Sequence, residues 1–141
     1  MPRRTTAIAA ALSVLALGSP LITANANPLA TQYFDQGVEK YDAGDYQGAM
    51  DEFNKAIEII SQKSYDAFTF RGIVKDQLED YQGAITDYNK AIEIDPQDAY
   101  AYYFRGSARE SVNDLEGACD DWRKRIDLGD NDSAERLELK C

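Results

Sequence analysis

The sequence predicts an all-α fold in which three similar helical hairpins stack into an α-solenoid, followed by a short C-terminal capping helix. A repeated pentapeptide is the first observation: DYQGA occurs at 45–49 and 80–84, and DLEGA follows at 114–118. The second observation is a spacing of 34 or 35 residues between corresponding Gly, Ala and aromatic positions: Gly37, Gly72 and Gly106; Ala49, Ala84 and Ala118; Phe53, Tyr88 and Trp122. Units of this length, each forming one hairpin, bury their apolar faces by stacking.

The apolar residues recur with the period of an α-helix. Ala49, Phe53, Ala56 and Ile57 form one stripe in the first unit, and the second unit repeats this stripe 35 residues later. The Asp of each DYQG or DLEG is placed to cap the second helix of its hairpin. The expected helices cover 29–43, 46–60, 64–78, 81–94, 98–112 and 115–127, with a capping helix over 131–140.

The spaced positions are explained by packing between the two helices of a hairpin. Antiparallel helices approach closely only where one has no side chain and the other a small one, so each Gly is expected to face an Ala. The aromatic residue four positions after that Ala lies one turn further on the same face. It would fill the wider space beside the close contact.

Residues 1–26 have the pattern of a signal peptide that is cleaved. Arg3 and Arg4 precede an apolar run over 7–17, and Ala24-Asn25-Ala26 has the small-x-small form of a cleavage site. An uncleaved membrane anchor is the alternative, but the run is shorter than the roughly 20 residues that span a bilayer. We therefore expect an exported chain that does not span the membrane after cleavage, located in a periplasm, a photosynthetic lumen or the external medium.

The charge of the chain limits its partners. Removing residues 1–26 takes away two arginines and no acids, which leaves 13 basic and 25 acidic residues and a net charge of −12. Such a chain repels nucleic acids and anionic lipids, so we expect no nucleic-acid partner and favour a basic or neutral protein. Solubility of an exported protein explains the same charge.

The two cysteines lie on either side of a turn near Gly129. Cys119 is ten residues before it and Cys141 twelve residues after it, so an antiparallel helix pair would bring them within disulfide reach. Export to an oxidising compartment favours this bond. A buried thiol at Cys119 with a free Cys141, or a bridge between chains, are the alternatives. Two sulfurs in a chain without histidine make a poor zinc site.

The sequence offers little support for catalysis. Because the chain has no histidine, the usual Ser-His and Cys-His nucleophile pairs are excluded. No glycine-rich phosphate loop is present, and the acids at 127–132 match a calcium loop only loosely. We expect no enzyme activity, no cofactor, no metal and no small-molecule substrate.

The second unit resembles the tetratricopeptide (TPR) repeat. It contains Phe68-x-x-Arg71-Gly72-x-x-Lys75, then Ala84-x-x-x-Tyr88, Ala91 and Pro96. The resemblance covers residues 29–128 and places three repeats within 27–128, at about 30–63, 65–98 and 99–128, with 129–141 as the cap. The segment 117–141 also looks like the end of small exported repeat proteins of bacteria, cyanobacteria among them.

In TPR proteins the first helix of each hairpin lines a concave groove, which binds peptides or helices of partner proteins. The resemblance assigns these groove positions: Thr31, Phe34, Val38 and Tyr41; Asp66, Thr69, Ile73 and Asp76; Tyr100, Tyr103, Ser107 and Glu110. A packing role is the alternative for Phe34 and Tyr103. In related repeats, cations at set groove positions bind the C-terminal carboxylate of chaperones. In this chain those positions have no cation; they are occupied by Phe34, Val38, Phe70, Tyr100 and Phe104.

These observations predict an exported protein-interaction module with a scaffold or assembly role and no catalysis. The alternative is a structural protein that self-associates, because the exposed ends of short repeat arrays can stack or exchange helices.

Overall fold

The computed structural model describes residues 27–60 and 64–141. The predicted signal peptide, 1–26, lies outside the described residues. Those described form α-helices and one 3₁₀ turn, with no strand among them. The elements are α1 (Pro28–Asp42), α2 (Tyr46–Ile60), α3 (Tyr65–Gln77), α4 (Tyr81–Ile94), α5 (Ala99–Ser111), α6 (Leu115–Asp127), η2 (Asn131–Ser133) and α7 (Ala134–Lys140).

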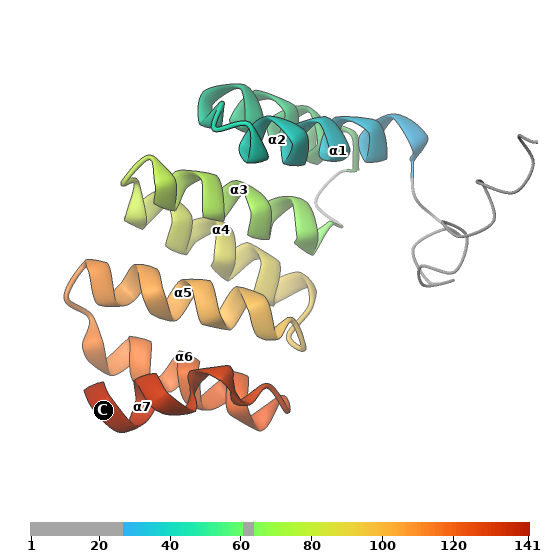
Figure 1. Cartoon of the computed structure of the whole chain (residues 1–141). Coiled ribbons are helices and arrows are strands. Elements are labelled where there is room, and N and C mark those ends of the chain that lie inside the picture. Colours follow the sequence, from blue (N-terminus) through green and yellow to red (C-terminus); the bar gives the residue numbers. More distant parts are fainter. Residues whose placement is uncertain (1–26, 61–63) are drawn as a thin grey trace, which may run out of the picture.

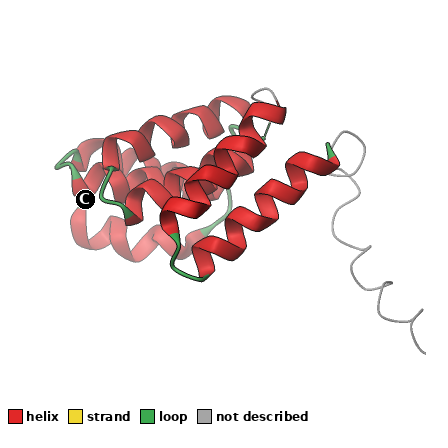
Figure 2. Ribbon diagram, turned by 90° about the horizontal axis from the view of Figure 1, so that it is seen from above, coloured by secondary structure: helices red, strands yellow, loops and turns green. Residues whose placement is uncertain are grey.

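The helices pack in hairpins that stack in chain order. α1 packs on α2, α3 on α4 and α5 on α6, while α2–α3 and α4–α5 contacts join consecutive hairpins. In Figure 1 the helices α1, α3, α5 and α7 lie toward the viewer and α4 and α6 lie behind them; Figure 2 shows the same stack from above. This arrangement confirms the predicted all-α solenoid of helical hairpins.

The second helix of each hairpin begins at an aspartate that caps it. Asp80 Oδ1 accepts a hydrogen bond from the Gly83 amide at 3.0 Å, and the corresponding bonds join Asp45 to Gly48 and Asp114 to Gly117. A Cβ atom built on Gly83 would lie 2.1 Å from Asp80 Oδ2. The Gly of DYQG is therefore required because the capping carboxylate folds over it.

The first and second helices of a hairpin meet at a glycine. A Cβ atom built on Gly72 would lie 2.5 Å from Cε1 of Tyr88, whose side chain is fully buried. Any side chain at this position would push the two helices apart. Equally close contacts occur in the other hairpins, between Gly37 and Phe53 and between Gly106 and Trp122. Each of these glycines therefore faces the aromatic ring and not the Ala expected from the sequence, because the ring itself fills the space that the missing side chain leaves. Ala49, Ala84 and Ala118 are fully buried.

The C-terminal segment differs from the single helix expected over 131–140. It begins as the 3₁₀ turn η2, because Asp130 Oδ1 accepts the Asp132 amide and Arg125 donates to both Asp130 and Ser133. α7 then runs back along α6, and a disulfide joins Cys119 to Cys141 with their Cα atoms 5.9 Å apart. None of the helices described is long and apolar enough to cross a membrane.

Candidate functional site: the face of the first helices

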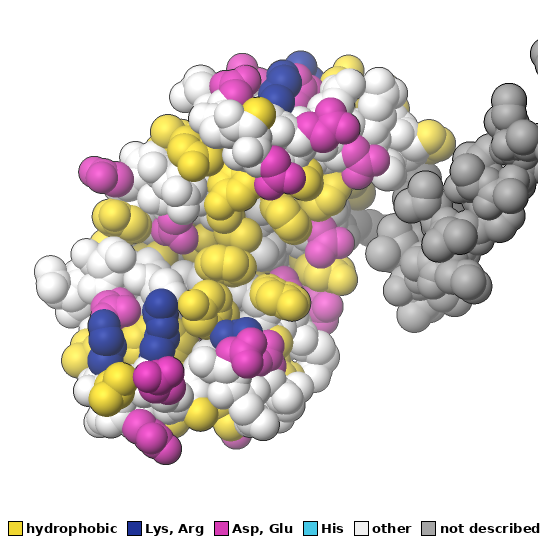
Figure 3. Space-filling model, viewed as in Figure 1, with side chains coloured by type: hydrophobic (Ala, Val, Ile, Leu, Met, Phe, Trp, Pro, Cys, Tyr) yellow, Lys and Arg dark blue, Asp and Glu magenta, His cyan; other side chains and the backbone are white. Residues whose placement is uncertain are grey.

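The surface formed by α1, α3 and α5, called here the first-helix face, contains the predicted groove positions. Each of these helices packs against the next, so the three lie side by side. Figure 3 shows this side of the molecule, with hydrophobic side chains gathered across its middle, acids around them, and dark blue cations both toward the α7 end and at the α1 end. The positions differ in what they contact.

The α1 positions contribute apolar surface that is partly engaged in packing. Thr31 is exposed, whereas Phe34, Val38 and Tyr41 are half-buried against the core of the first hairpin. The ring of Phe34 lies 5.2 Å from that of Phe70, centroid to centroid, in an edge-on arrangement. Phe34 therefore helps to join the first two hairpins as well as reaching the surface.

Two of the four α3 positions are acidic. Asp66, Ile73 and Asp76 are half-buried, but Thr69 is only 5% exposed and donates a hydrogen bond to Asp98 Oδ2 at 3.1 Å. Thr69 therefore belongs to the contact between the second and third hairpins. It is not available to a ligand, because the N-terminal end of the next hairpin covers it.

The α5 positions are divided between open surface and contact with α7. Tyr100 is 62% exposed. The guanidinium of Arg136, from α7, lies 5.2 Å from the ring centroid of Tyr103 and donates to Ser107 Oγ at 2.9 Å. Glu110 pairs with Lys140, also from α7. Three of the four predicted positions in the third hairpin thus contact this molecule's own C-terminal helix.

A set of buried acids, not anticipated from the sequence, holds each hairpin together. Asp87 on α4 has a side chain only 3% exposed, and it accepts paired hydrogen bonds from Arg71 at 2.7 and 2.8 Å and an ion pair from Lys75 at 2.9 Å. Burying a carboxylate is costly unless cations and hydrogen bonds compensate it, and here two cations do so. Asp121 has the same role in the third hairpin with Arg105 and Arg109, and Glu52 in the first with Lys40.

The same arginines also connect consecutive hairpins. Arg71 donates from its remaining Nη1 to Asn54 Oδ1 on α2 at 2.8 Å, and Arg105 bonds to Asn89 on α4 in the same way. The 34- and 35-residue spacing of these acids, cations and asparagines was a signal in the sequence that could have revealed the network. These acids, cations and asparagines recur with the same spacing as the Gly, Ala and aromatic positions.

This network determines the charge of the first-helix face. All five cations of α1, α3 and α5 are tied to second-helix acids: Lys40, Arg71, Lys75, Arg105 and Arg109. Five acids of α1 and α3 have no ion pair within the described chain: Asp35, Glu39, Asp42, Asp66 and Asp76. The face consequently presents uncompensated carboxylates beside apolar side chains.

Two of these carboxylates are perturbed by burial. Burial raises the pKa of Asp76 to about 6, against the opposing effect of a hydrogen bond from the Tyr88 hydroxyl to Asp76 Oδ2 at 2.6 Å. Its other oxygen, Oδ1, is buried and accepts no hydrogen bond within the described chain. Burial, followed by the nearby Asp98 and Asp95, raises the pKa of Asp66. Neither acid forms an ion pair with a described residue of the chain.

The described residues contain no cluster of His, Cys, Asp or Glu that could hold a metal ion. An open cavity of about 360 Å³ lies elsewhere, between α3 and α4, and its lining includes Phe68, Arg71, Asp87 and Lys90. It shares no residue with the predicted groove positions and is flanked by the Arg71–Asp87 pair.

Comparison with known proteins gives a match to one repeat-family model. Residues 77–112, from the end of α3 through α4 and α5, match the family model described as TPR repeat. No curated protein sequence matches the chain.

Solved TPR domains have the same fold. The Arabidopsis OM64 TPR domain matches with a TM-score of 0.74 and 26% identity, over 78% of this chain and 91% of that one. The first TPR of Spaghetti (RPAP3), bound to the HSP90 peptide SRMEEVD, matches with a TM-score of 0.74 and 23% identity, over 78% and 88%. The TPR2B domain of yeast Sti1, in a complex with pHsp70, matches with a TM-score of 0.72 and 22% identity, over 79% and 92%. The chain therefore has the fold of a TPR domain.

Proposed function

We propose that this chain is an exported protein-interaction module that binds a basic peptide or helix of a partner on its first-helix face. Its role is that of a scaffold or assembly factor, without catalysis. The observation that carries the proposal is the charge division described above: the cations of α1, α3 and α5 pair with buried acids, while the acids of α1 and α3 have no ion pair within the described chain. Such a surface attracts a basic segment and repels an acidic one.

Apolar contacts supply the second part of the interaction. Tyr41, Ile73 and Tyr100 lie on successive first helices and remain half-buried or exposed. Aromatic side chains on a rigid scaffold are frequent anchors at interfaces, because they bury a large area with few rotatable bonds. A partner segment with apolar groups between its basic ones would satisfy both features of the face.

The neighbouring TPR domains suggest the mode of binding but not the ligand. The RPAP3 domain holds SRMEEVD, a peptide rich in acids. The cations of α1, α3 and α5 are engaged in the buried pairs, so the carboxylates of α1 and α3 would repel an anionic peptide on this part of the face. We therefore propose the TPR mode of peptide recognition with the opposite preference for charge.

A peptide selection with a matched pair of variants tests the proposal. Random peptides are displayed, selected on the wild-type protein, and the affinity of the enriched sequences is measured by fluorescence anisotropy. We expect enriched sequences to combine Lys or Arg with apolar residues. Tyr100→Ala/Asp66→Asn should weaken binding at least roughly tenfold, because it removes one exposed anchor and one acid of the face.

The control variant makes the same kind of change on the second helices. Leu115→Ala/Glu58→Gln removes one exposed apolar side chain and one exposed acid from α6 and α2. It should bind like the wild type. Enrichment of acidic peptides, or equal loss in both variants with both folded by circular dichroism, would contradict the proposal. Dimers without peptide binding would favour the self-associating alternative.

Export rests on residues 1–26 and has its own test. Protein recovered from outside the cytoplasm should begin at Asn27 by N-terminal sequencing, as cleavage after Ala26 requires. Protein that retains Met1 and fractionates with the cytoplasm would contradict it.

A further inference from the structure

The C-terminal helix α7 covers part of the first-helix face. Its Arg136 contacts Tyr103 and Ser107 on α5, and its Lys140 pairs with Glu110. Arg136 also lies 5.7 Å from the ring of Trp122, the single tryptophan of the chain, whose side chain is fully buried. α7 therefore covers predicted ligand positions and contacts Trp122, whose fluorescence can report a movement of α7.

α7 has little of its own to hold it in place. It is seven residues long and contains no fully buried residue. Helices this short are unstable in isolation, because too few hydrogen bonds form to offset the ordering of the first turn. Its apolar contact is Leu137, half-buried against the Ala118, Cys119 and Trp122 cluster. Its polar contacts are partly exposed and individually weak.

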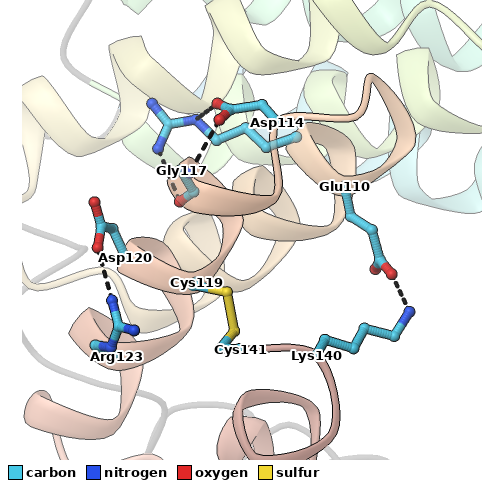
Figure 4. Close-up of a disulfide and its surroundings, with 9 residues drawn as sticks. Glu110, Asp114, Gly117, Cys119, Asp120, Arg123, Lys140 and Cys141 are labelled. Carbon is cyan, nitrogen blue, oxygen red and sulfur yellow. Dashed lines mark hydrogen bonds and ion pairs between the residues drawn. A yellow bond between two sulfur atoms is a disulfide. The ribbon is translucent and has the colours of Figure 1, made fainter.

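The covalent attachment lies at the last residue of the chain. Figure 4 shows Cys141 beyond the end of α7, joined to Cys119 of α6, with the Lys140–Glu110 pair beside it. Because the bond closes a segment of 22 residues, it keeps the far end of α7 near its site even when the other contacts open.

We propose that α7 is a lid on the third-hairpin part of the first-helix face, and that the Cys119–Cys141 disulfide keeps it closed until a dithiol reductant opens it. Cys141 is exposed and Cys119 is only 6% exposed, so the attacking thiolate reaches Cys141 Sγ. The S–S bond breaks, and Cys119 leaves as a thiolate that takes a proton from water. The second thiol of the reductant then displaces Cys141, so that the reductant becomes a disulfide and the protein gains two thiols.

The contacts of α7 indicate what replaces it once it leaves. Tyr103, Ser107 and Glu110 together accept a guanidinium in the closed state. A basic side chain of the partner segment proposed above would take the same place, extending its binding surface along α5 beyond Tyr100. This consequence rests on the proposed function, whereas the lid motion is measured without any partner.

Hydrogen exchange and tryptophan fluorescence test the lid. The protein is compared oxidised, reduced with dithiothreitol, and as Cys119→Ala/Cys141→Ala, with free thiols verified by mass spectrometry. In the reduced and double-variant forms we expect exchange in 134–140 to rise at least roughly tenfold, while 46–127 keeps its protection. The emission of Trp122 should shift to longer wavelength as water reaches the ring.

Two results would overturn the lid. Unchanged exchange in 134–140 after complete reduction would mean that noncovalent contacts alone hold α7. Loss of protection throughout the chain in both thiol forms would make the disulfide a general stabiliser of the fold. As a control, Arg136→Ala/Lys140→Ala with the disulfide intact should keep 134–140 protected, because the bond and not these contacts closes the lid; loss of protection there would also overturn the proposal.

Peptide binding separates this inference from the proposed function. A basic peptide selected as described above should bind the Cys119→Ala/Cys141→Ala variant at least roughly tenfold more tightly than the oxidised wild type. Equal affinity for both forms would overturn the binding consequence while leaving the proposed function intact. If no peptide is selected, the proposed function is contradicted. The hydrogen-exchange measurement still decides whether α7 is a lid. If dimers form only on reduction, the surface that α7 uncovers binds a second copy of this chain. That result would overturn the proposal that it binds a basic segment of a different partner.

Discussion

Asp76 shows how a single side chain on the first-helix face departs from ordinary behaviour. It is half-buried, has one oxygen without a hydrogen bond, and has no cation beside it in the described chain. Burial raises its pKa to about 6 from the ordinary 3.8. The folded protein thus binds this proton more tightly than the unfolded chain. The contribution of Asp76 to stability is greatest below pH 3.8 and is lost as the pH rises through about 6.

We predict that Asp76→Asn stabilises the protein at neutral pH and above but not in acid. The amide cannot ionise, and its oxygen can still accept the hydrogen bond from the Tyr88 hydroxyl. Urea unfolding at about pH 8 and about pH 4 measures the difference, which should be present at the higher pH and absent at the lower. Asp35→Asn, at an exposed position of α1, should show no such contrast. A lower stability of Asp76→Asn at the higher pH would contradict the prediction.

Substitution of Gly72 by Ala has two opposing effects on the free energy of unfolding, and their sizes can be compared. Replacing a helical Gly with Ala gains roughly 1 kcal/mol from helix propensity. The new Cβ would lie 2.5 Å from Tyr88, a fully buried ring, so the hairpin must open. Overpacking of this kind costs about 1–3 kcal/mol and more where the helices cannot shift.

We therefore predict that Gly72→Ala lowers the free energy of unfolding despite its favourable propensity. Denaturant unfolding measures it, with Gln47→Ala, at an exposed position of α2, as the control that should be neutral or slightly stabilising. An increase in stability for Gly72→Ala would mean that the α3–α4 contact is looser than described.

At the scale of the elements, one buried acid holds each pair of helices together. Asp87 joins α4 to α3 through Arg71 and Lys75, and Arg71 continues to Asn54 of the preceding hairpin. These bonds replace water around the charges, so the removal of one partner leaves the others poorly compensated. The network therefore fixes the register of the helices and keeps their cations away from the first-helix face.

Asp87→Asn is expected to destabilise the protein by about 3 kcal/mol, because it leaves two cations beside a neutral group. Chemical denaturation measures this value. Glu93→Gln breaks the exposed Lys90–Glu93 pair on the same helix and should cost less than about 0.5 kcal/mol. Equal effects of the two substitutions would show that burial does not strengthen the Asp87 network.

Much of the fold could be predicted because the repeat sets both the helices and their contacts. α2, α4 and α6 have the predicted bounds, and α1, α3 and α5 differ by one residue at each end. The division of the C-terminal segment into η2 and α7 was not predicted. It depends on Arg125 bonding to Asp130 and Ser133, and a tertiary hydrogen-bond set of this kind leaves no periodic pattern.

The site was less predictable than the fold. The family positions place Tyr100 and Ile73 on open or half-open surface, but they also include Thr69, which the next hairpin covers, and Tyr103, which α7 covers. A list of positions from one repeat cannot tell whether the neighbouring unit lies over them. The exposure of a side chain at the junction between two hairpins depends on how far one hairpin is displaced from the next. That displacement is set by packing along the whole stack.

At the scale of the whole molecule, the acidic excess combines with the unpaired carboxylates of the first-helix face. Attraction between this surface and a basic ligand should weaken as salt screens it. We predict that the affinity for a selected basic peptide falls as sodium chloride is raised from about 50 to about 500 mM, mostly through a slower association rate. Stopped-flow fluorescence measures this rate. A rate independent of salt would mean that apolar contacts alone drive encounter.

The most direct measurement is a map of the bound peptide by NMR chemical shift changes in isotopically labelled protein. Binding on the first-helix face predicts that the largest shifts fall on α1, α3 and α5, at Tyr41, Ile73 and Tyr100, while α2, α4 and α6 change little. Shifts concentrated on the second helices, or at the two ends of the stack, would contradict that assignment. The partner would then bind a different surface, or the protein would act by association with itself.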